Sequence, residues 1–280
     1  MADTLKTARY LSLPIVLGAV CSNRLAARLS DVTPIHWATS LVLALVVFCI
    51  YTVDRLLDIR KPGQPNTPRH AFHRRHALVL WQLVAGAAVL ALILTFFLPA
   101  SVIRFGVGLG VICAGYLAIV YRLPARHPAL LAKEPLVAIL YSVGIWGSVW
   151  VQRPGTTGTE LAEGLMFMAI ALQNLLLFSV METREPGGLS GFSVATVWGT
   201  TRCNQLLRGL TAGVVAAAFA ICFVTNEPGG GPRFAERAAI MLGIMSVVLY
   251  VIQRYPAHFT RYERYRRLGD AVFWLPALVL

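Results

Sequence analysis

Long apolar stretches recur along this sequence, and they restrict what the chain can fold into. A helix needs roughly 17–25 mainly apolar residues to cross a bilayer, and runs of about this length lie at residues 8–29, 34–57, 77–98, 101–121, 134–152, 161–181, 205–224 and 236–253. A ninth run begins near Leu268 and covers only about 20 Å at helical rise. Charged residues make up 14% of the chain, whereas a soluble domain averages about a quarter. We therefore expect an all-α, polytopic membrane protein in which residues 1–280 form one helical domain of eight or nine spans.

The basic residues predict how the chain is oriented in the membrane. The net charge is +12, but the Lys and Arg residues lie between apolar runs, so topology and lipid headgroups explain them better than nucleic acid does. If the N-terminus is cytoplasmic, 19 of the 25 basic residues fall on the cytoplasmic side. This bias predicts an integral membrane protein, as in a bacterial inner membrane, with two long polar loops at about 54–76 and 182–204 facing the cytoplasm. The five scattered cysteines indicate neither a disulfide framework nor a metal site.

Two carboxylates stand where the second apolar run ends. Asp54 and Asp58 are four residues apart, so on a continuing helix they share one face, within about 6 Å of each other. Two acids this close repel each other unless a cation lies between or beside them. Magnesium is one answer, because proteins bind it with one or two carboxylates together with substrate phosphates. The other interpretation is a pair of ordinary helix-end acids balanced by Arg55 and Lys61.

Weaker polar signals lie farther along the chain. Glu182 and Glu185 follow the sixth run and indicate either a second acidic site or an ordinary turn, since Pro186 and the glycines after it end the helix. Lys133 opens the fifth run, where it would reach a diphosphate or simply extend to the membrane interface. Asn174, inside the sixth run, would bond to a neighbouring helix or contact a headgroup.

Three histidines, His70, His73 and His76, lie three residues apart in the first polar loop. Zinc is one interpretation, but no thiolate is near and the spacing matches no closed zinc pattern. The other interpretations are that they add positive charge to a phosphate-facing loop or that they lie in water.

The order of these features resembles the UbiA family of intramembrane prenyltransferases, which carry two aspartate-rich motifs on cytoplasmic loops after the second and sixth spans. Asp54-Arg55-Leu-Leu-Asp58 is similar to the end of the first motif, and Asn66-Thr67-Pro68-Arg69 is similar to the element that follows it. The stretch from Ser193 to Gly199 resembles the one after the second motif, which registers Glu182 and Glu185 with the acids of that motif. Lys133 lies where the family often has a basic residue.

The resemblance implies an enzyme that moves a prenyl group from a prenyl diphosphate to a lipophilic, membrane-embedded acceptor with the help of Mg²⁺. The catalytic acids would be Asp54, Asp58, Glu182 and Glu185, of which Asp54 and Asp58 would hold one ion and Glu182 a second. The substrate-binding residues would be Arg55, Arg69, Lys133 and Asn174. Metal and cations together would stabilise charge on the departing diphosphate.

Two other functions fit the same sequence. Ile50 and Tyr51 stand where the family usually has Asn-Asp, and the second motif retains only glutamates. These differences favour, as the alternative, a non-catalytic UbiA-like membrane protein that binds a lipid or a partner subunit. A transporter ranks last, because transport sites use ionisable groups near the bilayer midplane and no acid or base is expected deep in any run.

Overall fold

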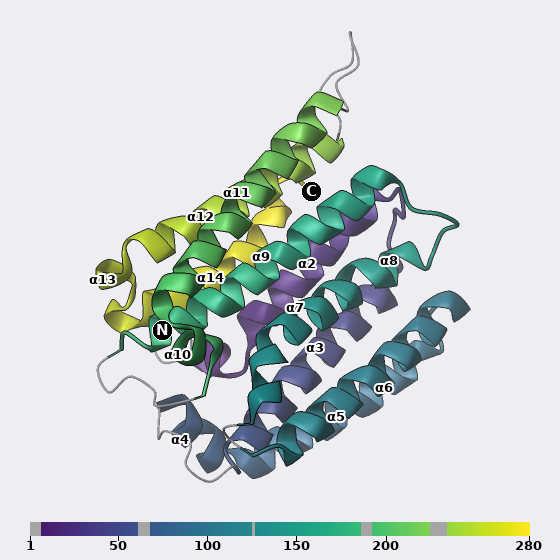
Figure 1. The fold of residues 1–280 in the computed structure, drawn as a ribbon. Helices are drawn as coiled ribbons and strands as arrows, with labels where there is room; N and C mark the ends of the chain where they lie inside the picture. The colour runs from purple at the N-terminus through teal and green to yellow at the C-terminus, as the bar shows by residue number, and fades with distance from the viewer. Residues whose placement is uncertain (1–6, 61–67, 125–126, 186–191, 225–233) are drawn as a thin grey trace.

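The computed structural model describes residues 7–60, 68–124, 127–185, 192–224 and 234–280. The regular elements within these ranges are all helical (Figure 1). Seven helices among the described residues are long and apolar enough to cross a membrane. The protein is therefore an all-α polytopic membrane protein, as the apolar runs predict. Lys61, Asn66 and Thr67 of the first polar loop, and Pro186 of the second, lie outside the described residues.

The long helices run side by side in a bundle (Figure 1). Six of the seven are continuous: α3 (Trp37–Asp58), α5 (Ala77–Thr95), α6 (Ala100–Arg122), α9 (Gly158–Glu182), α11 (Thr200–Val224) and α12 (Phe234–Arg254). The seventh is composite, made of η1 (Pro128–Ala132), α7 (Lys133–Ser142), the π-helical turn η2 (Val143–Gly147) and α8 (Ser148–Trp150). Short helices gather at one end of the bundle, hereafter the motif end: α4 (Pro68–Arg75), α10 (Val194–Trp198), α13 (Pro256–Phe259), η3 (Arg261–Glu263) and α14 (Arg264–Ala271).

Two further expected spans have a different form. The first run contains α2 (Leu13–Leu29), which has 17 residues and buries polar Ser22 and Asn23 inside the bundle. The last run becomes η4 (Val272–Leu278), a 3₁₀ helix that covers about 14 Å, whereas the hydrocarbon core of a bilayer is about 30 Å thick. Here η4 packs along α2, where Trp274 Nε1 donates a hydrogen bond of 2.7 Å to the carbonyl of Pro14.

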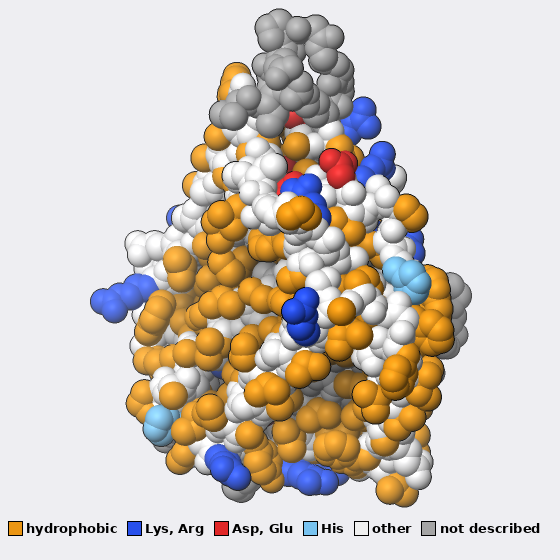
Figure 2. Space-filling model, turned by 90° about the vertical axis from the view of Figure 1, so that its right-hand side faces the viewer, with side chains coloured by type: hydrophobic (Ala, Val, Ile, Leu, Met, Phe, Trp, Pro, Cys, Tyr) orange, Lys and Arg blue, Asp and Glu red, His pale blue; other side chains and the backbone are white. Residues whose placement is uncertain are grey.

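Apolar burial holds the bundle together. One cluster of buried apolar side chains joins α2, α3, α7, α9, α11, α12 and η4. Of the spans, α9 is the most deeply buried and α6 the least. Figure 2 shows a face covered largely by apolar side chains, and α5 alone exposes Leu78, Val89 and Leu92. Such an apolar surface suits contact with lipid. The helical backbone suits it too, because hydrocarbon offers no hydrogen-bond partners and the N–H and C=O groups must be paired within the helices.

Close approach of η4 to α2 generates a test of this packing. A Cβ at Gly18 would lie 2.7 Å from Cβ of Phe273, nearer than real Cβ atoms approach. We expect Gly18→Ala to destabilise the protein by about 1–3 kcal/mol, because overpacking forces backbone shifts, and to lower its melting temperature in detergent. Gly115→Ala is the control, because nothing lies within 4 Å of a Cβ there. Equal melting of the two variants would contradict the α2–η4 contact.

Candidate functional site

Lys133 joins the two carboxylates at the end of α3. Its Nζ lies 3.5 Å from Oδ1 of Asp54 and 3.9 Å from Oδ2 of Asp58. Arg55 adds a contact of 3.9 Å to Asp58. Because one ammonium contacts both carboxylates, the two acids share a face and converge on one cation, as their spacing predicts. Asp54 and Asp58 are hereafter the acid pair.

Local structure explains why a cation is needed here and how Lys133 supplies it. A carboxylate in the last turn of a helix opposes the helix dipole, at a cost of about 0.3–1 kcal/mol. The acid pair occupies the last turns of α3. Lys133 is the first residue of α7, directly after η1, whose first turn is capped by His127 Nδ1 accepting from the Ala129 N–H at 3.2 Å. The turn of η1 thus places the ammonium next to α3.

Arg69 of α4 brings more positive charge to the acid pair. The cations near Arg69 are Arg55 and Arg266, and the anions near it are Glu182 and Asp58. The charge of Arg55, then burial, then the charge of Arg266 lower the pKa of Arg69 to about 9. A guanidinium whose pKa is lowered by other cations lies in surroundings that favour an anion. Asp58 and Glu182 both lie near Arg69. The two segments that begin at Asp54 and at Glu182, hereafter the first and second motif segments, therefore meet around this residue.

The histidines of α4 lie inside the protein. His70 and His73 are buried, so the expectation that they lie in water is wrong for these two. Burial, then the charges of Arg69 and Arg55, lower the pKa of His70 to about 4, so it adds no positive charge at neutral pH. His73 Nδ1 lies 2.9 Å from the carbonyl of Arg69. Among the described residues, no group of three His, Cys, Asp or Glu is arranged to hold a metal.

The second acidic segment is bound by α14. Arg266 Nη2 donates to Oε1 of Glu182 at 2.5 Å, and the hydroxyl of Tyr265 donates to Oε1 of Glu185 at 2.7 Å. Gly269 lets α14 lie against α9, because a Cβ there would come within 2.5 Å of Oδ1 of Asn174. α14 therefore holds both glutamates, and Glu182 also lies near Arg69, which in turn lies near Asp58 of the acid pair.

Asn174 lies deeper in the bundle than the acids. It precedes Glu182 by eight residues, or about 12 Å along α9. The side chain is 6% exposed, and its Oδ1 has no hydrogen-bond partner among the described residues. The structure places Asn174 beside Gly269 of α14, about two turns of helix before the end of α9.

Sequence reasoning missed the part that α14 plays at this end. Tyr265 and Arg266 precede the last apolar run, where Arg266 counted only toward the charge bias and Tyr265 was given no role. Asp270 of the same helix has Arg266, Arg55 and Arg69 as charged neighbours. The polar residues before the apolar C-terminal segment are a signal in the sequence that α14 lies at the motif end. They do not show which helix α14 contacts.

Tyr116 of α6 and Glu163 of α9 were missed as well. The hydroxyl of Tyr116 is buried near Asp54 and Asp58 and lacks a hydrogen-bond partner among the described residues. Glu163 is 0% exposed, and neither carboxylate oxygen has a partner in the described part of the chain. It is the sixth residue of α9, so an acid does lie inside a span, one to two turns from its end.

Comparison with known protein families gives no significant match, and neither curated proteins nor solved structures provide one.

The residues around the acid pair suit a divalent cation and a phosphate group. Two carboxylates already converge on one positive charge, and Mg²⁺ uses one or two carboxylates and completes its shell with phosphate oxygens and water. The unpartnered Tyr116 hydroxyl beside them is a polar group that a ligand would satisfy. Arg55, Arg69 and Lys133 supply cations that bind phosphate.

Removing Lys133 should expose the acid pair to metal. We expect Lys133→Met to lower the melting temperature in detergent, because Asp54 and Asp58 then repel each other. Millimolar MgCl₂ should restore more of this loss than it adds to the wild type, since the ion replaces the ammonium. The matched control is Lys133→Met combined with Asp58→Asn, in which one acid is gone. An equal Mg²⁺ response in both variants would contradict a cation site between these acids.

The buried His70 predicts a pH dependence of stability. Between its ordinary pKa of about 6.5 and the folded value of about 4, the unfolded chain takes up a proton that the folded protein refuses. The free energy of unfolding should therefore fall as pH decreases through this window, by up to about 3 kcal/mol. We expect His70→Gln to flatten the decline in detergent melting curves from pH 7 to pH 4. The exposed His258→Gln variant controls for loss of a histidine, and a decline unchanged in His70→Gln would disprove the assignment.

Proposed function

We propose that this protein is a UbiA-like intramembrane prenyltransferase, which transfers a prenyl group from a prenyl diphosphate to a membrane-embedded acceptor with Mg²⁺. The observation that carries the proposal is the convergence of Asp54 and Asp58 on one cation, beside Arg55 and Arg69, at one end of an apolar bundle. The bias of basic residues supports a cytoplasmic position for this end and for the N-terminus, as in a bacterial inner membrane.

Each charged residue has a separate part in this proposal. Asp54 and Asp58 would hold Mg²⁺, which when bound neutralises charge on the diphosphate. Glu182 is the candidate for a second ion, and it would exchange its partner Arg266 for it. Glu185 would fix the position of α14 through Tyr265. Membrane lipids surround the bundle, and the acceptor would enter from them.

The basic residues would act on the leaving group. The bond between the allylic carbon and the diphosphate oxygen breaks, and the electron pair departs with the diphosphate. Lys133, Arg55 and Arg69 would stabilise this charge by hydrogen bonds that strengthen as it develops. The allylic carbon then bonds to the acceptor, which loses a proton. Asn174, about 12 Å along α9 from Glu182, would contact the acceptor or prenyl chain rather than the diphosphate.

A second candidate function is the binding of a lipid or partner subunit without catalysis. One observation favours it: the acids of both motif segments already have partners within the protein. Lys133 contacts Asp54 and Asp58, Arg266 pairs with Glu182, and Tyr265 bonds to Glu185. A site that is neutralised in this way is stable without metal or substrate.

Turnover by purified protein separates the two candidates. We expect detergent-purified protein with MgCl₂, a prenyl diphosphate series and membrane lipid acceptors to release diphosphate. Asp54→Asn and Asp58→Asn should each lower the rate by about 100-fold or more, because charge stabilisation at the leaving group is lost. Glu263→Gln is the matched control, an acid of the same end that pairs with Arg9 instead.

The outcomes differ clearly. Full activity of Asp58→Asn would disprove the prenyltransferase proposal. Metal-dependent binding of the diphosphate by wild-type protein without turnover would favour the non-catalytic candidate.

A further inference from the structure

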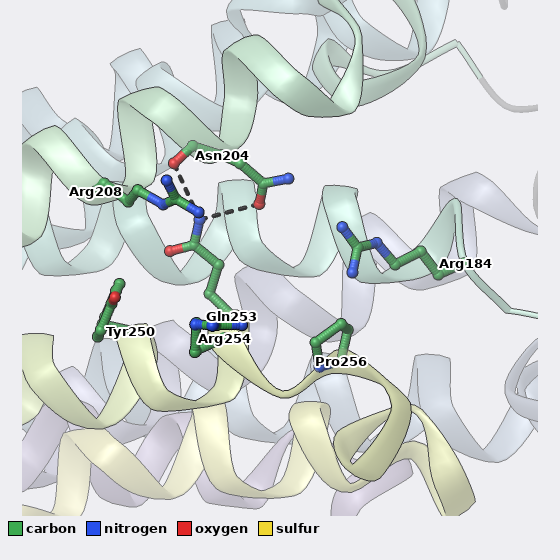
Figure 3. Close-up of a pocket in the computed structure, with 7 residues that line it drawn as sticks. All are labelled: Arg184, Asn204, Arg208, Tyr250, Gln253, Arg254 and Pro256. Atoms are coloured by element: carbon green, nitrogen blue, oxygen red, sulfur yellow. Dashed lines mark hydrogen bonds between the residues drawn. The ribbon is translucent and has the colours of Figure 1, made fainter.

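A second basic site lies apart from the acid pair, between α11 and α12. It is a pocket of about 270 Å³ lined by residues that follow α9 or belong to α11, α12 and α13 (Figure 3). Its lining residues are Arg184, Asn204, Arg208, Tyr250, Gln253, Arg254 and Pro256. Pockets for drug-sized ligands occupy about 300–1,000 Å³, so this one suits a compact group. None of the residues assigned to prenyl transfer lines it.

Three arginines give this pocket its charge. Arg184, Arg208 and Arg254 come from three different segments and all line the same space. None of these guanidinium groups forms a salt bridge in the part of the chain that the structure describes, although Arg254 lies 5.9 Å from the ring centre of Tyr255. Three cations around one cavity repel one another unless an anion lies among them. This contrasts with the acid pair, where carboxylates and cations neutralise each other.

Gln253 is the second observation that points to a ligand. The side chain is 8% exposed and lines the pocket. Its Nε2 donates to both the backbone carbonyl and Oδ1 of Asn204, each at 3.0 Å, and Figure 3 shows both bonds. These two acceptors determine which end of the amide is nitrogen. The remaining oxygen, Oε1, has no partner among the described residues, so the pocket offers a buried acceptor to a hydroxyl group.

The surroundings of the pocket favour a ligand from the membrane. Val247, Val251 and Arg254 share one face of α12, because they are spaced four and three residues apart. Val247 is 42% exposed and Val251 is 40% exposed. An apolar strip therefore leads along α12 to the arginines, as the chains of a lipid would. Basic pockets between membrane helices commonly bind lipid headgroups.

We propose that this pocket binds the phosphate of an anionic phospholipid whose headgroup also carries a free hydroxyl. The arginines hold the phosphate oxygens, Oε1 of Gln253 accepts a hydrogen bond from the headgroup hydroxyl, and the acyl chains lie along α12. Phosphatidylglycerol is the simplest lipid with this chemistry. The site holds this lipid whether or not the acid pair catalyses prenyl transfer.

Lipid titration tests this site. Full-length protein in nanodiscs of phosphatidylcholine receives increasing fractions of phosphatidylglycerol, and thermal stability and retained lipid are measured. We expect phosphatidylglycerol to stabilise the wild type and to be retained on extraction. The double variant Arg208→Gln, Arg254→Gln should need at least about tenfold more phosphatidylglycerol to reach the same stabilisation, because charge-assisted hydrogen bonds are lost.

The controls keep the test decisive. Arg202→Gln removes an exposed arginine of α11 that does not line the pocket, and it should leave the titration unchanged. Arg208→Lys keeps the charge but loses the planar fork, so it should fall between the wild type and the double variant. The response of Asp58→Asn should equal that of the wild type, which separates this site from the prenyl transfer proposal.

Three results would overturn the proposal. The first is equal stabilisation by phosphatidylcholine. The second is equal stabilisation by inorganic phosphate or glycerol phosphate at matched concentration, which would assign the pocket to free phosphate. The third is a loss of response in Arg202→Gln as large as that in the double variant, which would reduce the effect to general surface charge.

Discussion

The shared contact of Lys133 with Asp54 and Asp58 is the interaction on which the motif end depends. It joins the end of α3 to the start of α7 across 79 positions of sequence, and it offsets both the mutual repulsion of the acids and their unfavourable place at a helix C-terminus. The neighbouring pairs extend the same principle, since Arg266 and Tyr265 attach α14 to the acids at the end of α9. Apolar burial holds the bundle together, whereas charge pairs arrange this end of it.

The site at the acid pair and the pocket between α11 and α12 differ in their balance of acidic and basic residues, and this difference separates their proposed roles. At the acid pair, carboxylates are paired with cations, so the site is stable alone, and in the proposed function it would accept a metal and a phosphate by exchange of partners. The pocket of Arg184, Arg208 and Arg254 contains no acid among its lining residues. The mutual repulsion of these arginines is therefore relieved only by an anion that binds from outside the protein.

Predictions from sequence succeeded where one helix decides the answer. The spacing of Asp54 and Asp58 placed them on one face because both belong to α3. The same reasoning failed for the histidines of α4, since nothing local shows that His70 and His73 are buried. It gave Lys133 two possible roles, and only its distance to α3 shows which groups it contacts. The last apolar run was expected as a ninth span or an incomplete one, and η4 packs along α2 as a short 3₁₀ helix.

The sequence by itself determined the class of the protein and the positions of most spans, because hydropathy and the length needed to cross a bilayer are properties of continuous segments. It also determined which acids could share a helix face. Only the tertiary structure decided that α14 folds back onto α9, that Arg69 lies between the two motif segments, and that three arginines from separate segments line one pocket. These contacts join residues far apart in the chain, and their geometry depends on how whole helices pack against one another.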